Sequence, residues 1–65
     1  MITVNGKEME VTKPVTMEEY LEENHYKINQ VAVELNYEIL PKSNYASTVL
    51  KDGDRIEIVS FVGGG

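Results

Sequence analysis

The chain has 65 residues, enough for one small domain around a single hydrophobic core and too few for a second. It has no cysteine and one histidine, which excludes a disulfide framework and an ordinary Cys/His zinc site. The net charge of -5 argues against a phosphate-binding surface for nucleic acid or anionic lipid and favours a basic protein partner.

The first eleven residues are predicted to form a β-hairpin. Asn5-Gly6 lies at its centre, and both residues tolerate the positive φ that a type I′ turn requires. Apolar residues alternate with polar ones on either side of this turn, at Ile2, Val4, Met9 and Val11. Pro14 then ends the pattern, because proline cannot donate a hydrogen bond to a strand ladder.

A short helix is predicted from about Val15 to Asn24. Thr16 and Glu19 have the spacing of a capping box, in which each side chain accepts a hydrogen bond from the other residue's backbone. Val15 and Tyr20 are placed to form a hydrophobic staple. The apolar face has the i, i+3, i+4 spacing of one buried stripe and consists of Met17, Tyr20 and Leu21. Because no second helix of this length is predicted, it must pack on a sheet.

The next strand is predicted from Gln30 to Leu35. Ala32 lies on one face, and the other face carries Val31, Val33 and Leu35. Asn36-Tyr37 turns the chain into a short extended segment at residues 38–40. Residues 43–46 are predicted to form one helical turn with a weak serine cap.

The last strand is predicted from Arg55 to Val62 and is the most apolar. Ile56 and Ile58 lie on one face, whereas Val59 and Phe61 lie on the other. A strand that is apolar on both faces is usually central in its sheet, or has one face covered by another protein.

The outward face of this strand is a candidate partner-binding surface. If the isoleucines face the helix, Val59, Phe61 and Val62 are available to dock a partner enzyme. The alternative is that loop residues such as Leu40 or Leu50 cover them, because the sequence does not determine which face the long loop covers.

The order of elements is strand, strand, helix, strand, short segments, strand. The regularity of the first and last strands favours their pairing in the middle of a mixed sheet of four to five strands. The one main helix would cross one face of that sheet. This is the α+β arrangement called the β-grasp, and we expect residues 1–62 to form it as a single domain, with residues 63–65 as a flexible tail.

Three glycines, Gly63, Gly64 and Gly65, follow the last strand. A tail without Cβ atoms can enter a channel that is too narrow for any other residue and deliver its terminal carboxylate to a distant active site. That carboxylate, with a reference pKa of about 3.5, is ionised at neutral pH and can attack the α-phosphate of ATP. The product is an acyl-adenylate, which a sulfur or nitrogen nucleophile opens readily. The simpler interpretation is a frayed end without function.

The second half of the chain carries a joint pattern of motifs. It consists of Val31–Asn36, Ile39–Pro41, Tyr45, Leu50–Ile58 and Val62–Gly65. Together these segments resemble the ThiS family, the small sulfur carrier proteins of thiamin biosynthesis. The family's minimum ending is Gly-Gly, so Gly64-Gly65 is the matching pair and Gly63 is an added hinge.

This resemblance implies a ubiquitin-like carrier rather than an enzyme. Gly65 would be adenylated by a ubiquitin-activating-like adenylyltransferase, which uses ATP with magnesium, while the carrier itself binds no cofactor. Sulfur from a donor protein would convert the adenylate to a thiocarboxylate, and thiazole synthase would then take that sulfur to build the thiazole ring of thiamin.

Three other functions remain open at this point. The small subunit of molybdopterin synthase shares the fold and the terminal Gly-Gly but tends to be longer. A ubiquitin-like modifier would end in an isopeptide bond on a target lysine. A plain interaction module would have an inert tail.

The remaining polar residues are interpreted as structural. The helix carries a solvated acidic face rather than a cation site, formed by Glu18, Glu19, Glu22 and Glu23. His25 has no nucleophile near it in sequence, and the tyrosines are predicted to pack rather than to stack on bases. No apolar run approaches the ~18 residues of a membrane span, and no signal-like segment opens the chain, so we expect a cytoplasmic protein without membrane or nucleic-acid partners.

Overall fold

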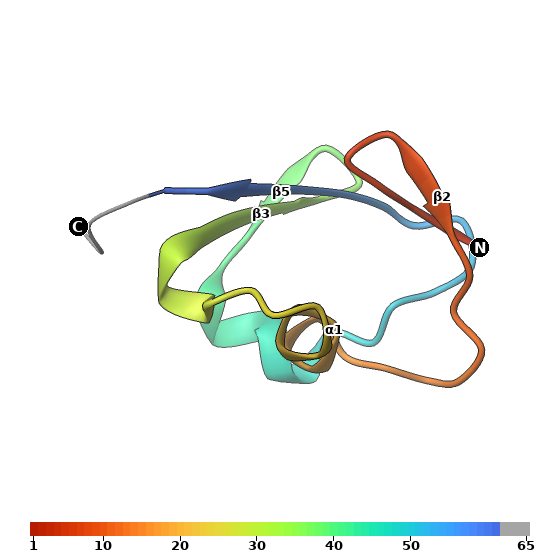
Figure 1. The fold of residues 1–65 in the computed structure, drawn as a ribbon, viewed down its shortest axis with the longest axis horizontal. Helices are drawn as coiled ribbons and strands as arrows, with labels where there is room; N and C mark the ends of the chain where they lie inside the picture. The colour runs from red at the N-terminus through yellow and green to blue at the C-terminus, as the bar shows by residue number, and fades with distance from the viewer. Residues whose placement is uncertain (62–65) are drawn as a thin grey trace.

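The computed structural model describes residues 1–61, and Figure 1 shows a sheet with the helix α1 packed beneath it. The strands are β1 (Ile2–Val4), β2 (Lys7–Met9), β3 (Val31–Leu35), β4 (Glu38–Leu40) and β5 (Arg55–Ser60). The helices are α1 (Met17–Glu23) and two 3₁₀ helices, η1 (Ile28–Gln30) and η2 (Lys42–Ser47). Val62 and the three glycines lie outside the described residues, so the prediction of a separate tail is not addressed by this fold.

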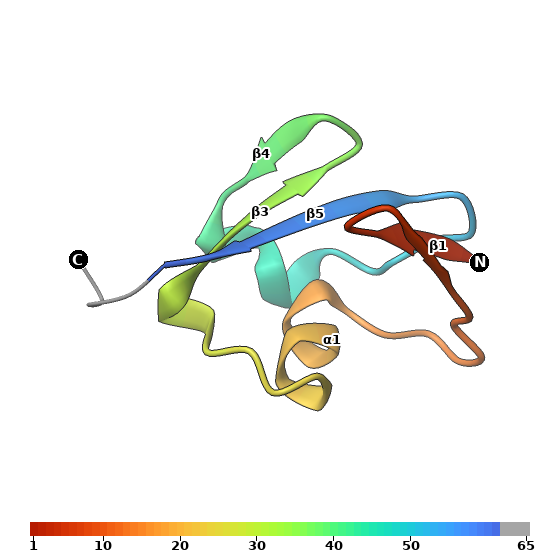
Figure 2. The ribbon, with the colours of Figure 1, turned by 45° about the horizontal axis from the view of Figure 1, so that its top comes forward.

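The five strands form one mixed sheet in the order β2-β1-β5-β3-β4 (Figure 2). β1 and β5 are parallel, and the other neighbouring pairs are antiparallel. The first and last strands therefore pair inside the sheet, as the order of elements predicts. The β-grasp arrangement is confirmed.

The first hairpin turns at Asn5 and Gly6, whose φ angles are 50° and 84°. Positive φ at both positions is the type I′ geometry that matches the twist of a two-residue hairpin. The strand that follows ends at Met9, so Val11, predicted as part of the hairpin, lies in the connection to α1 and packs half-buried against the core.

The capping box of α1 is present as predicted. The Glu19 backbone N–H donates to the Thr16 hydroxyl at 3.1 Å, and the Thr16 N–H donates to the Glu19 carboxylate at 2.9 Å. The helix buries Met17 and Leu21 against the sheet. A helix of 7 residues is too short to be stable alone, so this packing is what stabilises it.

The long connection between β4 and β5 lies on the same side of the sheet as α1. Its 3₁₀ helix starts after Pro41 without a side-chain cap, so the predicted serine cap is wrong. Tyr45 within it is only 2% exposed, and Leu50 is buried beside it in the core. This connection closes the core from below and leaves the opposite face of the sheet uncovered.

Candidate functional site: the open face and far end of the last strand

The strand β5 carries apolar side chains on both of its faces. Ile56 and Ile58 point into the core between the sheet and α1, and Ile58 is 6% exposed. Val59 on the other face is 61% exposed, and Phe61, just past the strand, is 40% exposed. The prediction that these two residues face outward is confirmed. The alternative is wrong, because the loop that carries Leu50 packs on the other side of the sheet.

Neighbouring strands extend this open face. The register pairs Ala32 with Val59, and it pairs Glu34 both with Glu57 and with Ile39. Ile39 is 79% exposed, which is unusual for an isoleucine in a strand. These strands form a shallow pocket of about 230 Å³ on the open face, and the residues that line it are Ala32, Val33, Glu34, Ile39, Glu57 and Val59.

Ile39 is the member of this surface that the sequence analysis did not identify. The signal was present in the two-residue turn at Asn36 and Tyr37, because a two-residue turn determines the register of its hairpin. That register places residue 39 opposite residue 34, on the face of Ala32. Ile39 stands between Glu38 and Leu40 in a strand of three residues, so the sequence gave no alternation from which to assign a face.

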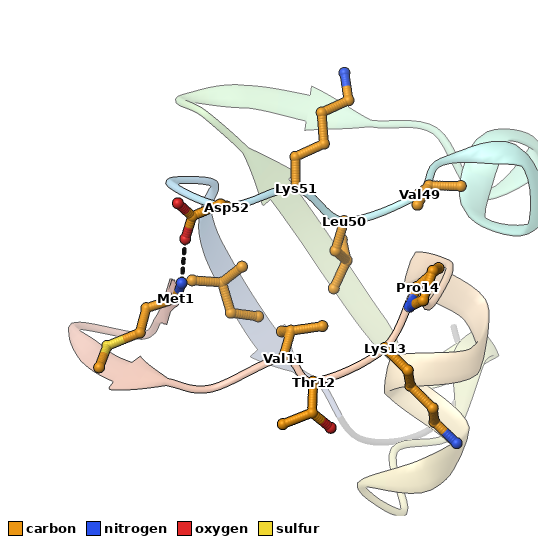
Figure 3. Close-up of a pocket in the computed structure, with 10 residues that line it drawn as sticks. Met1, Val11, Thr12, Lys13, Pro14, Val49, Leu50, Lys51 and Asp52 are labelled. Carbon is orange, nitrogen blue, oxygen red and sulfur yellow. Dashed lines mark hydrogen bonds and ion pairs between the residues drawn. The ribbon is translucent and has the colours of Figure 1, made fainter.

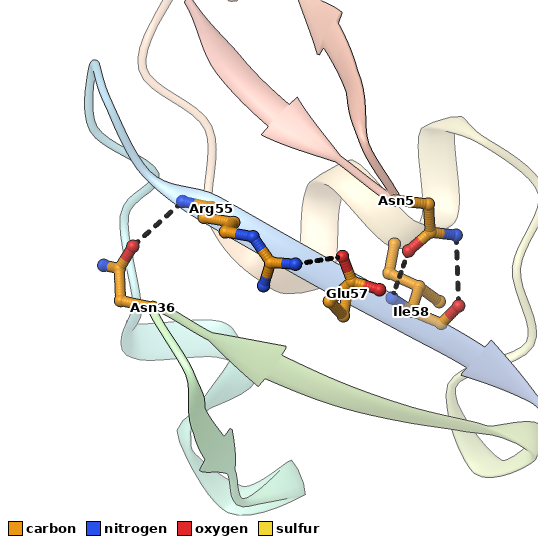
Figure 4. Close-up of polar contacts among 5 residues, drawn as sticks. All are labelled: Asn5, Asn36, Arg55, Glu57 and Ile58. Atoms are coloured by element: carbon orange, nitrogen blue, oxygen red, sulfur yellow. Dashed lines mark hydrogen bonds and ion pairs between the residues drawn. The ribbon is translucent and has the colours of Figure 1, made fainter.

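One end of the open face carries a charged group (Figure 4). The Arg55 guanidinium lies 3.0 Å from the Glu57 carboxylate and 4.4 Å from the centre of the Tyr37 ring. Tyr37 was predicted to be a packing residue, and the structure places it on the surface, where it is 74% exposed. Its ring instead covers the arginine, as in a surface cation–π contact.

Two asparagine side chains form hydrogen bonds with the backbone of β5, one at its first residue and one farther along the strand (Figure 4). The Asn36 carboxamide oxygen accepts the N–H of Arg55 at 2.9 Å, at the start of the strand. The Asn5 carboxamide accepts the N–H of Ile58 at 2.7 Å and donates to its carbonyl at 3.1 Å. Both asparagines are the first residues of two-residue turns, so the turns also secure the strand that leads to the glycines.

A second hollow, of about 460 Å³, lies at the N-terminal end of the sheet (Figure 3). There the Asp52 carboxylate contacts the N-terminal ammonium group, and this hydrogen bond and charge hold the pKa of Asp52 below its ordinary value of 3.8. The side chains of Lys13 and Lys51 extend away from each other and from this hollow. The charged groups that meet at this hollow are therefore the exposed Asp52 and the N-terminal ammonium group, and the hollow lies far from the tip of β5 (Figure 1).

The titratable side chains of residues 1–61 form no metal-binding cluster. This part of the chain contains no group of three or more His, Cys, Asp or Glu side chains able to hold a metal ion. Burial raises the pKa of Tyr45, and burial together with the nearby Tyr26 raises that of Tyr20, so both hydroxyls stay protonated at neutral pH. None of the helices described is long and apolar enough to cross a membrane.

The predicted site residues fall into two groups. Val59 and Phe61 lie together on the open face at the end of β5. Val62, Gly63, Gly64 and Gly65 lie outside the described residues.

The similarity of this chain to known proteins extends over almost its whole length. The family model described as the ThiS family matches residues 2–65. The sulfur carrier protein ThiS of Bacillus subtilis is 41% identical, and the alignment covers 100% of both chains. The crystal structure of the thiamine biosynthesis protein ThiS from Geobacter metallireducens superposes with a TM-score of 0.81 at 37% identity, over 98% of this chain and 97% of that one.

Two longer proteins also match this chain. The thiazole synthase of Paramagnetospirillum magneticum is 45% identical over 98% of this chain, which spans only 20% of that protein's length. The thiazole synthase of Magnetococcus marinus matches in the same way, at 34% identity and again over 20% of its length. In both proteins a segment similar to the whole of this chain is part of a larger polypeptide.

Proposed function

The chain belongs to the ThiS family, the sulfur carriers of thiamin biosynthesis, and from this premise we propose that it carries sulfur as a thiocarboxylate on Gly65. The observation that carries the proposal is the family match over residues 2–65, which includes the three glycines. The alignment with the Bacillus subtilis carrier, complete for both chains, supports the same assignment.

The reaction begins with the carboxylate of Gly65, which is ionised at neutral pH. One carboxylate oxygen attacks the α-phosphate of ATP, magnesium pyrophosphate leaves, and an acyl-adenylate forms. A hydrosulfide equivalent from a sulfur donor protein then attacks the acyl carbon and releases AMP and one proton. Sulfur enters at the oxidation level of sulfide, so neither step needs an oxidant or a reductant.

We assign the catalytic groups to the partner enzymes. An adenylyltransferase of the ubiquitin-activating type would bind ATP and magnesium, while this chain supplies the reacting carboxylate and a docking surface. The carrier would therefore be a co-substrate rather than an enzyme, and the cytoplasm is the compartment where we expect it to act. Gly63 and Gly64 would let the tail pass through a channel that admits no Cβ atom.

Thiazole synthase is the proposed acceptor of the sulfur. In two proteins named thiazole synthase, a segment similar to this chain makes up 20% of the polypeptide. Covalent linkage raises the effective concentration of one module near another, which suits a carrier that hands its cargo to that enzyme. We propose that the open face, with Val59 and Phe61, docks the partners, and that Val62, the next residue in the sequence, takes part in the docking.

The proposal is tested by incubating the purified chain with ATP, magnesium, the adenylyltransferase and sulfide, followed by intact mass spectrometry. We expect the mass gain that corresponds to replacement of one oxygen by sulfur at the C-terminus. A ladder of conjugates on lysines of other proteins would instead indicate a modifier, and an unchanged mass would contradict the carrier assignment.

A matched variant tests the role of the glycines. Gly64→Ala adds one methyl group and disfavours positive φ, and a misplacement of about 1 Å near a reacting carboxylate can cost on the order of a hundredfold in rate. We expect adenylation to slow by about that factor and the melting temperature to stay the same. Wild-type turnover in this variant would show that the channel does not require glycine.

A further inference from the structure

The two hairpin turns of the sheet differ at one position. Asn5-Gly6 joins β1 to β2 and Asn36-Tyr37 joins β3 to β4, and both asparagines have positive φ. The second residue of each turn also has positive φ, which is 84° at Gly6 and 71° at Tyr37. Glycine adopts this conformation freely, whereas a residue with a Cβ atom is strained in it. Tyr37 therefore stands at a position where glycine would favour folding.

The strain at Tyr37 is not offset by packing in the core. The side chain is largely exposed and does not belong to the hydrophobic core. Its ring lies 4.4 Å from the guanidinium of Arg55, which is itself held by the Glu57 carboxylate at 3.0 Å. The Asn36 carboxamide fixes the turn, because it donates to the Asp54 carboxylate at 3.1 Å and accepts the Arg55 N–H. A strained residue that its surroundings hold in place on the surface indicates a function.

Two carboxylates face each other beside this ring. The register pairs Glu34 with Glu57, and like charges opposite each other on neighbouring strands repel. Arg55 neutralises Glu57, whereas Glu34 has no cationic partner among residues 1–61. Both carboxylates line the apolar pocket that contains Ile39 and Val59. This surface is therefore complementary to a partner that presents apolar side chains next to a lysine or arginine.

We propose that Tyr37 is an anchor residue through which the open face binds the adenylyltransferase, at an apolar surface of that enzyme bordered by a lysine or arginine. The inference rests on the proposed function, because it names residues by which the activating enzyme recognises the carrier. Tyrosine suits this role because it offers a large, rigid contact area and loses little conformational entropy on binding. The contact with Arg55 orients the ring before binding, which lowers that loss further.

Charge favours the adenylyltransferase as the occupant of this surface. An enzyme that binds ATP needs positive charge around its active site, and that field attracts a carrier with a net charge of -5. A second carrier is disfavoured, because it would bring its own Glu34 and Glu57 to a face that already carries two carboxylates. Thiazole synthase is the alternative partner, and separate titrations with the two enzymes distinguish them.

The variant Tyr37→Gly separates binding from stability. Affinity for the adenylyltransferase is measured by calorimetric titration without ATP, and stability is measured by thermal unfolding. We expect about tenfold weaker binding, because the anchor is lost. The melting temperature should be unchanged or higher, because relief of the strain offsets the lost contact with Arg55. A tyrosine with a purely structural role would give a lower melting temperature and normal affinity, and this result would overturn the proposal.

Two further variants are controls for the loss of the ring. Tyr37→Phe keeps the aromatic contact and should restore the affinity to within about twofold of the unmodified chain. Met9→Ala removes an exposed apolar side chain from β2, where Met9 pairs with the buried Ile2 and so lies on the helix side of the sheet. It should bind like the unmodified chain. Equal weakening by Tyr37→Gly and Met9→Ala would overturn the proposal.

The charge of the enzyme's surface is tested with Glu34→Gln. Removal of this carboxylate should weaken binding about fivefold and make the affinity less dependent on salt, while the fold loses only a repulsion. Glu23→Gln, at the end of α1, changes the net charge by the same amount and should bind like the unmodified chain. Equal weakening by the two variants would contradict a basic group opposite Glu34.

Titration of Tyr37→Gly with thiazole synthase under the same conditions tests the choice of partner. Weaker binding to thiazole synthase alone, with normal binding to the adenylyltransferase, would overturn this inference and leave the proposed function standing. An unmodified carrier that binds neither enzyme would overturn both.

Discussion

The two faces of the sheet are built from similar side chains but have different roles. On the covered face, Val33 and Ile58 pack in the core with α1 and the connection that carries Tyr45. On the open face, Val59 in β5 and Ile39 in the edge strand β4 remain exposed.

One face of the sheet contributes to folding, whereas the other face is available for docking. A chain of 65 residues has a small core and needs all the apolar burial it can obtain. It nevertheless leaves a valine, an isoleucine and a phenylalanine uncovered on one face. A surface that does not contribute to the core is available for a partner, so the two faces should respond to mutation in different assays.

The largest expected difference comes from one isoleucine on each face. Ile58→Ala removes core atoms and should lower the free energy of unfolding by about 2–5 kcal/mol, whereas Ile39→Ala should change it by less than about 0.5 kcal/mol. Urea unfolding followed by circular dichroism measures both. If Ile58→Ala does not fold, Ile58→Val should still lose about 0.5–1.5 kcal/mol. Equal losses at the two positions would contradict the assignment of the faces.

A charge on the open face should affect binding and leave folding unchanged. Val59→Glu places a third carboxylate near Glu34 and Glu57, so we expect about tenfold weaker binding to thiazole synthase or to the adenylyltransferase. Lys42→Gln, on η2 in the layer of α1, changes the net charge by the same amount and is the control. Equal weakening by both variants would point to net charge rather than to this face.

The helix that covers one face depends on its cap. Thr16→Ala removes the oxygen that accepts the Glu19 N–H and should cost about 1 kcal/mol of stability, because that donor loses its partner. Thr12→Ala, in the exposed segment before the helix, should cost much less. Comparable losses in thermal unfolding would mean that packing alone holds α1 against the sheet.

The smallest effect is expected at the turn before β5. The N-terminal ammonium group lowers the pKa of Asp52, so its stabilising effect is present at neutral pH and disappears as the pH falls below 3.8. Asp52→Asn should slightly lower the melting temperature at neutral pH and match the wild type in acid. Because both groups are exposed, added salt should also remove the difference. A difference that persists in acid would contradict this origin.

Local signals were sufficient for most of the elements. The capping box places the N-cap of α1 at Thr16 as predicted, because its hydrogen bonds join positions three apart, although the helix itself begins at Met17 and not at Val15. Asn5-Gly6 specifies a hairpin because its two residues adopt positive φ readily. The alternation along β5 assigns Ile58 and Val59 to opposite faces without any knowledge of their neighbours. The motifs of the second half were enough to indicate the family, which the match over residues 2–65 confirms.

Other features depend on contacts between segments that are far apart in the sequence. The covered face of β5 was settled by the packing of α1 and of the connection that carries Tyr45, which no pattern within β5 encodes. Ile39 joins the open face through pairing across a turn. Asn5 closes the edge of β5 at Ile58 from 53 residues away, so its second role was invisible in a sequence where asparagine already suited the turn. Contacts of this kind depend on which surfaces the whole chain buries, and for that reason only the tertiary structure could show them.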